Sequence, residues 1–209
     1  MAPRAFYDRD PREVARELLG KVLLRTVLHP GRSVLLAGRI VETEAYLGVD
    51  DPAAHSAAGP TPRNRVLFGP PGHAYVYFIY GNHYCLNASC MPDGDAGCVL
   101  IRALEPLEGL ATMQQARGLP ARPAPSKFEL RLIASGPGRL TQAFSITRER
   151  DNGKDITSAA SDLRIVNDGF VPKDIVSTPR IGIRKATEEL LRFAIAGNAY
   201  VSGRRTLSG

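Results

Sequence analysis

The sequence lacks any apolar run long enough to cross a bilayer, and residues 1–6 lack the apolar stretch of a signal peptide. We therefore expect a cytoplasmic protein that does not enter a membrane. Cysteine is scarce, because the chain has only Cys85, Cys90 and Cys98, which cannot all pair with one another. Nothing demands an oxidising compartment, and free thiols in the core are expected. Internal repeats, low-complexity tracts and linkers are also missing, so residues 1–209 should form a single domain.

Acidic residues are few in one part of the chain. Overall, 27 Lys and Arg residues outnumber 21 Asp and Glu residues, which gives a net charge of +6 and a pI near 9.5. Between residues 117 and 150 only Glu129 and Glu149 accompany a set of basic residues, namely Arg117, Arg122, Lys127, Arg131, Arg139, Arg148 and Arg150. This stretch predicts a polyanion-binding surface, although an unused basic patch would have the same sequence pattern.

Hydrophobic periodicity predicts strands that mostly precede helices. Strands are expected at about 21–28, 33–47, 73–80, 84–91 and 98–104, with short late strands at 163–166, 180–183 and 192–196. Helices are expected between Asp10 and Gly20 and at 106–116, 126–134 and 138–145, whereas 50–65 and 151–160 are typical of loops. Because strands and helices do not alternate, we expect an α+β fold with a curved, largely antiparallel sheet flanked by helices.

The run Val41–Tyr46 places acids inside an apolar strand. In an extended chain Glu42, Glu44 and Tyr46 share one face, while Thr43 and Ala45 point the other way. A strand rarely has acids on its inward face unless something binds there. The alternative is an amphipathic edge strand whose acidic face is solvated.

Arg102 lies in the middle of a second apolar strand. A guanidinium is costly to bury unless a carboxylate receives it, so we expect an ion pair with Glu42, Glu44 or Glu105. That ion pair could be a purely structural one. A zinc module could also be drawn from His83, Cys85, Cys90 and Cys98, but the spacing contains no Cys-x-x-Cys pair.

A hairpin is predicted where Tyr75–Tyr80 and Tyr84–Ser89 flank Gly81-Asn82-His83, because Gly-Asn favours a tight reversal. Tyr80 would lie at its tip. An aromatic side chain at such a tip can serve as a wedge that enters a base stack, or it can fold back over the sheet.

These features occur within segments that resemble a known family. The segments are Val41–Leu47 with Ala53-Ala54-His55-Ser56, Thr61–Arg65, Tyr75–Asn87, Val99–Gly109 and Ser135-Gly136-Pro137. In this order they resemble the alkyladenine (3-methyladenine) DNA glycosylase family of base-excision repair. The resemblance extends from about residue 10 to residue 203 and depends on several uncommon strings with compatible spacing.

The resemblance implies a catalytic set. In this family, the glutamate that aligns with Glu44 activates a water that attacks C1′ of a flipped-out nucleotide. The arginine that aligns with Arg102 and the backbone carbonyl at the position of Ile181 hold that water. Glu42 is not the catalyst in this alignment. The chemistry needs no second acid when an alkylated purine is already cationic and leaves readily.

The resemblance also implies binding residues. The flipped purine would be held by side chains matching Tyr46, His55 and Tyr77, with a backbone contact at Ala53, and Asn87 would disfavour bases that carry a guanine amino group. Tyr80 would fill the vacated place in the duplex, and Arg139 and Arg148 would face phosphates.

The implied activity is that of a monofunctional DNA glycosylase acting as a monomer on double-stranded DNA with damaged purines, such as 3-methyladenine and, in a broader range, hypoxanthine or ethenoadenine. We expect no cofactor, no metal and no Schiff-base lysine, and the product would be an uncut abasic site. A damaged-DNA binding protein without catalysis is the alternative. It would use the same tyrosines and basic surface but would not require both Glu44 and Arg102.

Overall fold

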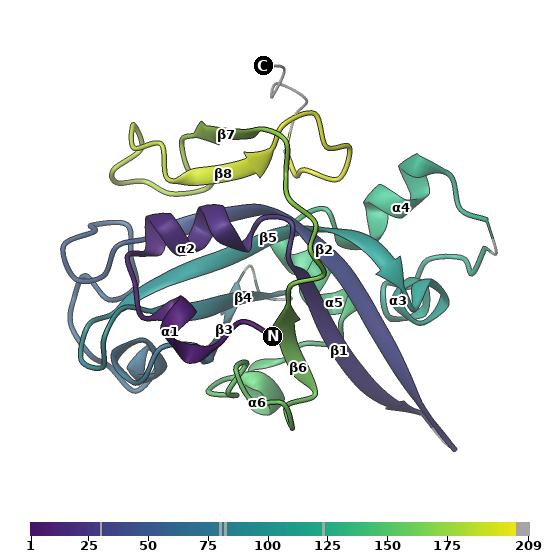
Figure 1. The fold of residues 1–209 in the computed structure, drawn as a ribbon, viewed down its shortest axis with the longest axis horizontal. Helices are drawn as coiled ribbons and strands as arrows, with labels where there is room; N and C mark the ends of the chain where they lie inside the picture. The colour runs from purple at the N-terminus through teal and green to yellow at the C-terminus, as the bar shows by residue number, and fades with distance from the viewer. Residues whose placement is uncertain (30, 80, 82, 123, 204–209) are drawn as a thin grey trace.

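One sheet organises the computed structural model, which describes residues 1–29, 31–79, 81, 83–122 and 124–203. The strand order is β3 (Ala74–Ile79), β4 (His83–Cys90), β5 (Gly97–Glu108), β2 (Arg32–Tyr46), β1 (Val22–His29) and β6 (Leu163–Val166). The last two strands, β7 (Ile175–Thr178) and β8 (Arg192–Ile195), pair with each other, and β8 also pairs with β2 (Figure 1). The strand pairings of the described residues are antiparallel, so the predicted α+β class is confirmed.

Strand β2 changes partner along its length. Its first half pairs with β1 as far as Arg39, and Glu42–Glu44 pair instead with β8. Strand β5 follows the other side of β2 and shows register shifts near Gly38 and Glu42. Such bulges bend and twist a strand. The sheet therefore curls where β2 passes from β1 to β8, and residues 42–44 lie between β5 and β8.

Helix α2 (Pro11–Leu18) covers one face of the sheet (Figure 1). The Asp10 side chain accepts a hydrogen bond from the Arg12 amide, and Pro11 occupies the first turn, as the sequence predicted. The Thr43 hydroxyl donates to the Ala15 carbonyl oxygen at 2.9 Å. Thr43 therefore faces α2, and its neighbours Glu42 and Glu44 point to the opposite face.

Three helices cover parts of that opposite face: α3 (Leu110–Ala116), α4 (Lys127–Ala134) and α5 (Pro137–Ala143). A capping box between Ser126 and Glu129 begins α4. The Thr141 hydroxyl of α5 donates to the Tyr84 carbonyl oxygen in β4 at 3.0 Å. Phe144, which ends α5, is buried and lies beside Gly38, so α5 is fixed against both β4 and β2.

Backbone from the segment after α6 (Arg148–Asp151) covers the edge strand β3. The Gly153 amide donates to the Ala74 carbonyl oxygen at 2.7 Å, and the Ala74 amide donates to the Lys154 carbonyl oxygen at 2.8 Å. The Val76 amide donates to the Asn152 side chain at 3.0 Å. These contacts pair backbone N–H and C=O groups of Ala74 and Val76 that the edge strand would otherwise leave without partners. They also hold α6 beside the strand that carries Tyr75 and Tyr77.

Several expected boundaries are wrong. Residues 180–183 do not form the expected strand, because the Arg180 side chain turns inward to a buried partner described below. The strand in this part of the chain is β7 instead. The helix expected from residue 106 begins only at Leu110, since β5 continues to Glu108 and Gly109 has a φ of +80° that ends the strand. The short helices α1 (Arg4–Tyr7) and α6 and a 3-10 turn at Arg65–Phe68 were not predicted. Tyr80 and Asn82 of the predicted hairpin tip lie outside the described residues.

Candidate active site

The candidate site is built on a row of directly paired residues that crosses the sheet from strand to strand. The registers place Tyr75 opposite Asn87, Asn87 opposite Leu100, Leu100 opposite Glu44, and Glu44 opposite Arg192. Neighbouring strands in a row present their side chains on the same face. The aromatic residues of β3 and the acids of β2, about 30 positions apart in sequence, therefore face one hollow.

Two buried carboxylates meet one guanidinium at the base of this hollow. Glu42 and Glu44 are fully buried, which contradicts the solvated edge-strand alternative. Arg102 Nε lies 2.8 Å from Glu42 Oε1, and its Nη1 lies 3.1 Å from Glu44 Oε1. The expected buried ion pair is confirmed, with two of the three acids named from sequence.

The two acids have different surroundings. Glu42 also accepts hydrogen bonds from Arg192 Nε at 2.7 Å and from the amide and hydroxyl of Ser202 at 2.6 and 2.9 Å. Glu44 instead accepts from the Ile181 amide at 2.8 Å and from the Tyr46 hydroxyl at 3.0 Å. Glu42 is thus occupied by structural donors. The partners of Glu44 are residues that line the cavity.

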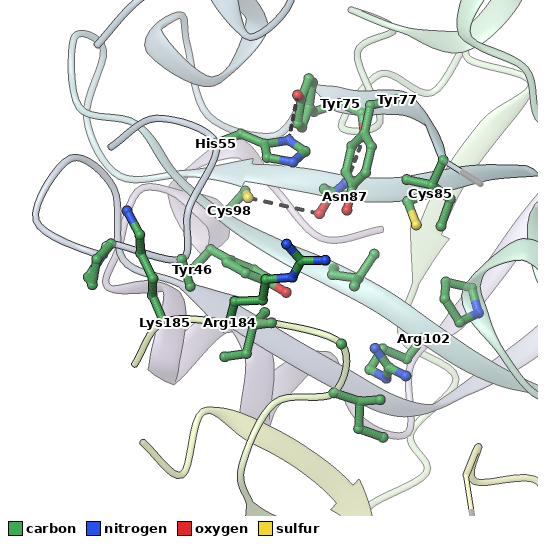
Figure 2. A pocket seen from close by; sticks show the side chains of 18 residues that line it. Tyr46, His55, Tyr75, Tyr77, Cys85, Asn87, Cys98, Arg102, Arg184 and Lys185 are labelled. Atoms are coloured by element: carbon green, nitrogen blue, oxygen red, sulfur yellow. Dashed lines mark hydrogen bonds between the residues drawn. The ribbon is translucent and has the colours of Figure 1, made fainter. Parts of the chain in front are cut away.

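The cavity has a volume of about 660 Å³ (Figure 2). Glu44 itself does not line it, but Tyr46, Arg102 and Ile181, which contact the Glu44 carboxylate, do. The predicted residues that the structure brings together in its lining are Tyr46, Ala53, His55, Tyr77, Asn87, Arg102 and Ile181. A hollow of this size with mostly apolar walls and a few convergent polar groups is typical of a small-molecule or base-binding site. The contact that the structure shows for Ile181 comes from its amide, whereas the family resemblance implied a role for its carbonyl.

Aromatic rings form one wall of the cavity. The His55 and Tyr77 ring centroids are 4.4 Å apart, and those of Tyr75 and Tyr77 are 5.4 Å apart. His55 Nδ1 lies 3.0 Å from the Tyr75 hydroxyl oxygen. Burial lowers the pKa of His55, and the charge of Arg63 lowers it further, so the imidazole is neutral near pH 7.

Asn87 is held in place on the same wall. Its Nδ2 donates to the Tyr75 carbonyl oxygen at 3.1 Å, and its Oδ1 accepts a weak hydrogen bond from Cys98 Sγ at 3.9 Å. Because both ends of the amide are engaged, the orientation of the Asn87 side chain is fixed.

A second buried ion pair fastens the loop that carries Ala53 and His55. Arg180 Nη2 lies 3.0 Å from Asp51 Oδ1, and Arg180 Nη1 donates to the Ala45 carbonyl oxygen at 3.1 Å. The guanidinium carbon also lies 4.7 Å from the Tyr46 ring centroid. Burial alone would raise the pKa of Asp51, but hydrogen bonds from Arg180 and from two backbone amides bring that pKa below its ordinary value. The ion pair therefore holds the Arg180 guanidinium against the Tyr46 ring and limits the movement of that ring.

Sequence reasoning missed four contributors to this site. Tyr75 could have been found, because it is two residues from Tyr77 and strands alternate faces with period two. Asp51, Arg180 and Arg184 gave no sequence signal, since only the fold brings residues 51 and 180–185 together.

The predicted phosphate-facing arginines are both exposed. Arg139 lies on α5, with its Nη1 3.5 Å from the Ser135 carbonyl oxygen, and Arg148 begins α6 beside β3. Other residues of the basic stretch make contacts within the protein. Arg131 donates to the Val201 and Gly203 carbonyl oxygens, and Arg122 pairs with Glu129. Fewer basic side chains of residues 117–150 are therefore free to bind a polyanion than the sequence indicated.

A sequence model of the methylpurine-DNA glycosylase family matches residues 5–199. The chain belongs to this family. It is 63% identical over 205 residues to a protein of Koribacter versatilis named "Putative 3-methyladenine DNA glycosylase", with 98% of this chain and 94% of the relative covered. Proteins with the same name in Burkholderia lata and Methanocella arvoryzae are 50% and 52% identical, covering 96% and 91% of this chain and 90% and 88% of the relatives. The predicted family and the class of enzyme, a DNA glycosylase, are thereby confirmed.

The cysteines of this methylpurine-DNA glycosylase family member are free and buried. Among the residues that the structure describes, no group of three His, Cys, Asp or Glu side chains is arranged to hold a metal ion. Within the same part of the chain, no helix combines the length and the apolar character that a membrane crossing requires.

Proposed function

We propose that the protein is a monofunctional DNA glycosylase that flips damaged purines out of duplex DNA and hydrolyses their N-glycosidic bond with a water activated by Glu44. One observation carries the proposal: the buried Glu44 carboxylate is held by Arg102, Tyr46 and the Ile181 amide, and these three residues line an aromatic cavity.

The flipped base enters between Tyr46 and the pair formed by His55 and Tyr77. Aromatic faces attract a cationic alkylated purine, by about 0.5–2 kcal/mol for each cation–π contact. The neutral His55 adds no repelling charge to that cation near pH 7. Asn87, fixed by its two hydrogen bonds, cannot move aside and therefore disfavours a base with an additional exocyclic amino group.

Hydrolysis needs a water on the sugar side of the base. Glu44 removes a proton from this water while its oxygen forms a bond to C1′, and the bonding pair of the N-glycosidic bond leaves with the base. A cationic alkylated purine then departs as a neutral molecule, so no second acid is required. The products are the free base and an abasic site in an uncut strand.

Glu42 does not perform this step. Its oxygens accept from two arginines and from Ser202, so a water has little access to them. Glu44 accepts one hydrogen bond at Oε2, from the Tyr46 hydroxyl, and Tyr46 lines the cavity. Arg102 and the Ile181 carbonyl then position the water.

DNA approaches across α5, α6 and the β3–β4 hairpin. Arg139 and Arg148 contact phosphates, and Tyr80, outside the described residues, fills the place that the base vacates. The substrate is duplex DNA with 3-methyladenine or a deaminated purine such as hypoxanthine.

The test is release of free base from a labelled duplex that bears one damaged purine, with and without chelator. The parent chain should release the base in both conditions, and Glu44→Gln should bind the duplex but release almost nothing. Tight binding without release from any alkylated or deaminated purine would instead make the protein a damage-binding factor.

A further inference from the structure

Arg184 is a charged side chain at the cavity to which the proposed reaction gives no role. Figure 2 shows it beside Tyr46, pointing into the cavity toward the wall of Asn87. No carboxylate of the described residues lies within 4.0 Å of its guanidinium nitrogens. Arg184 is exposed to solvent, and its guanidinium brings a positive charge to the cavity wall.

The backbone that carries Arg184 is fixed at its start. Arg180 is clamped by Asp51, and the Ile181 amide is bound to Glu44. Gly182 follows with a φ of +80°, a conformation that turns the chain sharply. Arg184 therefore projects from a short segment whose origin lies at the catalytic carboxylate.

The cavity has room for a base with Arg184 in place. Its volume of about 660 Å³ is what remains with the Arg184 side chain present. That volume falls in the middle of the range of about 300–1,000 Å³ that holds drug-sized ligands, and a purine alone is smaller than these. A base does not need to expel the guanidinium in order to enter.

We propose, on the basis of the proposed function, that Arg184 reads the flipped base and favours neutral 6-oxopurines such as hypoxanthine over cationic alkylated adenines. A guanidinium has only donors, and its fork matches the O6 and N7 acceptors of a 6-oxopurine. An adenine presents an amino group at the same edge, and an alkylated adenine adds a positive charge that repels Arg184. Arg184 thus opposes the preference for cations that the aromatic walls create.

The experiment measures single-turnover base release from two duplexes of one sequence, one with hypoxanthine and one with N3-methylated adenine. The variants are Arg184→Ala, Arg184→Lys and Lys185→Ala, the last removing the neighbouring charge at the cavity rim. In Arg184→Ala the ratio of hypoxanthine to methyladenine release should fall by about tenfold or more, the size expected for losing a hydrogen bond to a charged group. Arg184→Lys should keep the slow release of methyladenine but lose rate on hypoxanthine, because it retains the charge without the fork.

Two results would overturn the inference while the proposed function stands. An equal loss on both lesions in Arg184→Ala would assign the residue to phosphate binding, and an equal change of ratio in Lys185→Ala would show an effect of net charge alone. If the parent chain releases neither base nor any other damaged purine, the proposed function itself fails and the inference fails with it. A circular dichroism spectrum like that of the parent shows that each variant is folded.

Discussion

The Tyr46 hydroxyl donates a 3.0 Å hydrogen bond to Oε2 of Glu44, two residues earlier in the same strand. Side chains at this spacing share a face, so Tyr46 supplies both an aromatic ring to the cavity and an orienting donor for the carboxylate that we propose as the catalyst. Burial raises the pKa of Tyr46, and the negative charge of Glu44 raises it further, so the hydroxyl keeps its proton throughout the physiological range.

Replacement of this hydroxyl should separate the two roles of Tyr46. Tyr46→Phe keeps the ring but leaves Glu44 without one donor, so we expect the rate of base release to fall by about tenfold, the effect of roughly 1.4 kcal/mol from one charged hydrogen bond. Affinity for the damaged duplex should stay within about twofold, which is a small change in free energy. Single-turnover kinetics with a separate binding titration would measure both. A fall in affinity as large as the fall in rate would contradict an orienting role.

The two buried acids should respond differently to neutralisation. Glu42→Gln disrupts a site shared by Arg102, Arg192 and Ser202, and the loss of one partner of a buried pair costs about 3–5 kcal/mol of stability. Glu44→Gln should abolish catalysis at a smaller cost in stability. Urea denaturation and base release from the two variants would test this pair. If Glu44→Gln were inactive only because it unfolds, its catalytic role would lose its support.

The ion pair of Asp51 and Arg180 should make stability depend on acid pH. The pKa of Asp51 is lower in the folded protein than its ordinary value, so its contribution is fully present above the unfolded pKa of about 3.9. It is lost as the pH falls through the folded pKa. The difference in Tm between the parent and Asp51→Asn should therefore be constant above about pH 5 and shrink below about pH 4. A difference independent of pH down to acid unfolding would show that the charge of Asp51 is unimportant.

Charge reversal at the proposed phosphate-binding arginines should change the salt dependence of DNA binding. Arg139→Glu or Arg148→Glu should weaken binding to damaged and undamaged duplex alike and lower the slope of log K against log salt by about 0.9 for each phosphate that is no longer neutralised. Arg12→Glu is the matched control, because Arg12 lies in the first turn of α2, on the opposite face of the sheet. An unchanged slope in both variants, or an equal change in the control, would place the DNA elsewhere.

The sequence predicted the parts of the site that depend on local pattern. The alternation in Val41–Tyr46 and the isolated charge of Arg102 in an apolar strand were enough to expect a buried pair, and the structure contains it. The segment 180–183 was wrongly assigned as a strand, because it has no regular structure. Its position depends on Asp51, a contact across 129 residues that no local pattern contains. Tyr75 was within reach of the period-two argument, whereas the inward turn of Arg184 was not.

The change of partner of β2 from β1 to β8 also bears on the order in which the contacts of the site form during synthesis. Glu42 bonds to residues much later in the chain, across sequence separations of 150 residues to Arg192 and 160 residues to Ser202. Contacts this distant are the last that a chain can make as it is synthesised from its N-terminus. The first residues 1–190 could form most of the sheet, but Glu42 would still lack Arg192 and Ser202. A nascent chain on the ribosome would therefore hold a cavity whose buried carboxylate cluster is unfinished, and the enzyme would become competent to cut bases from DNA only once residues 192–202 have been synthesised.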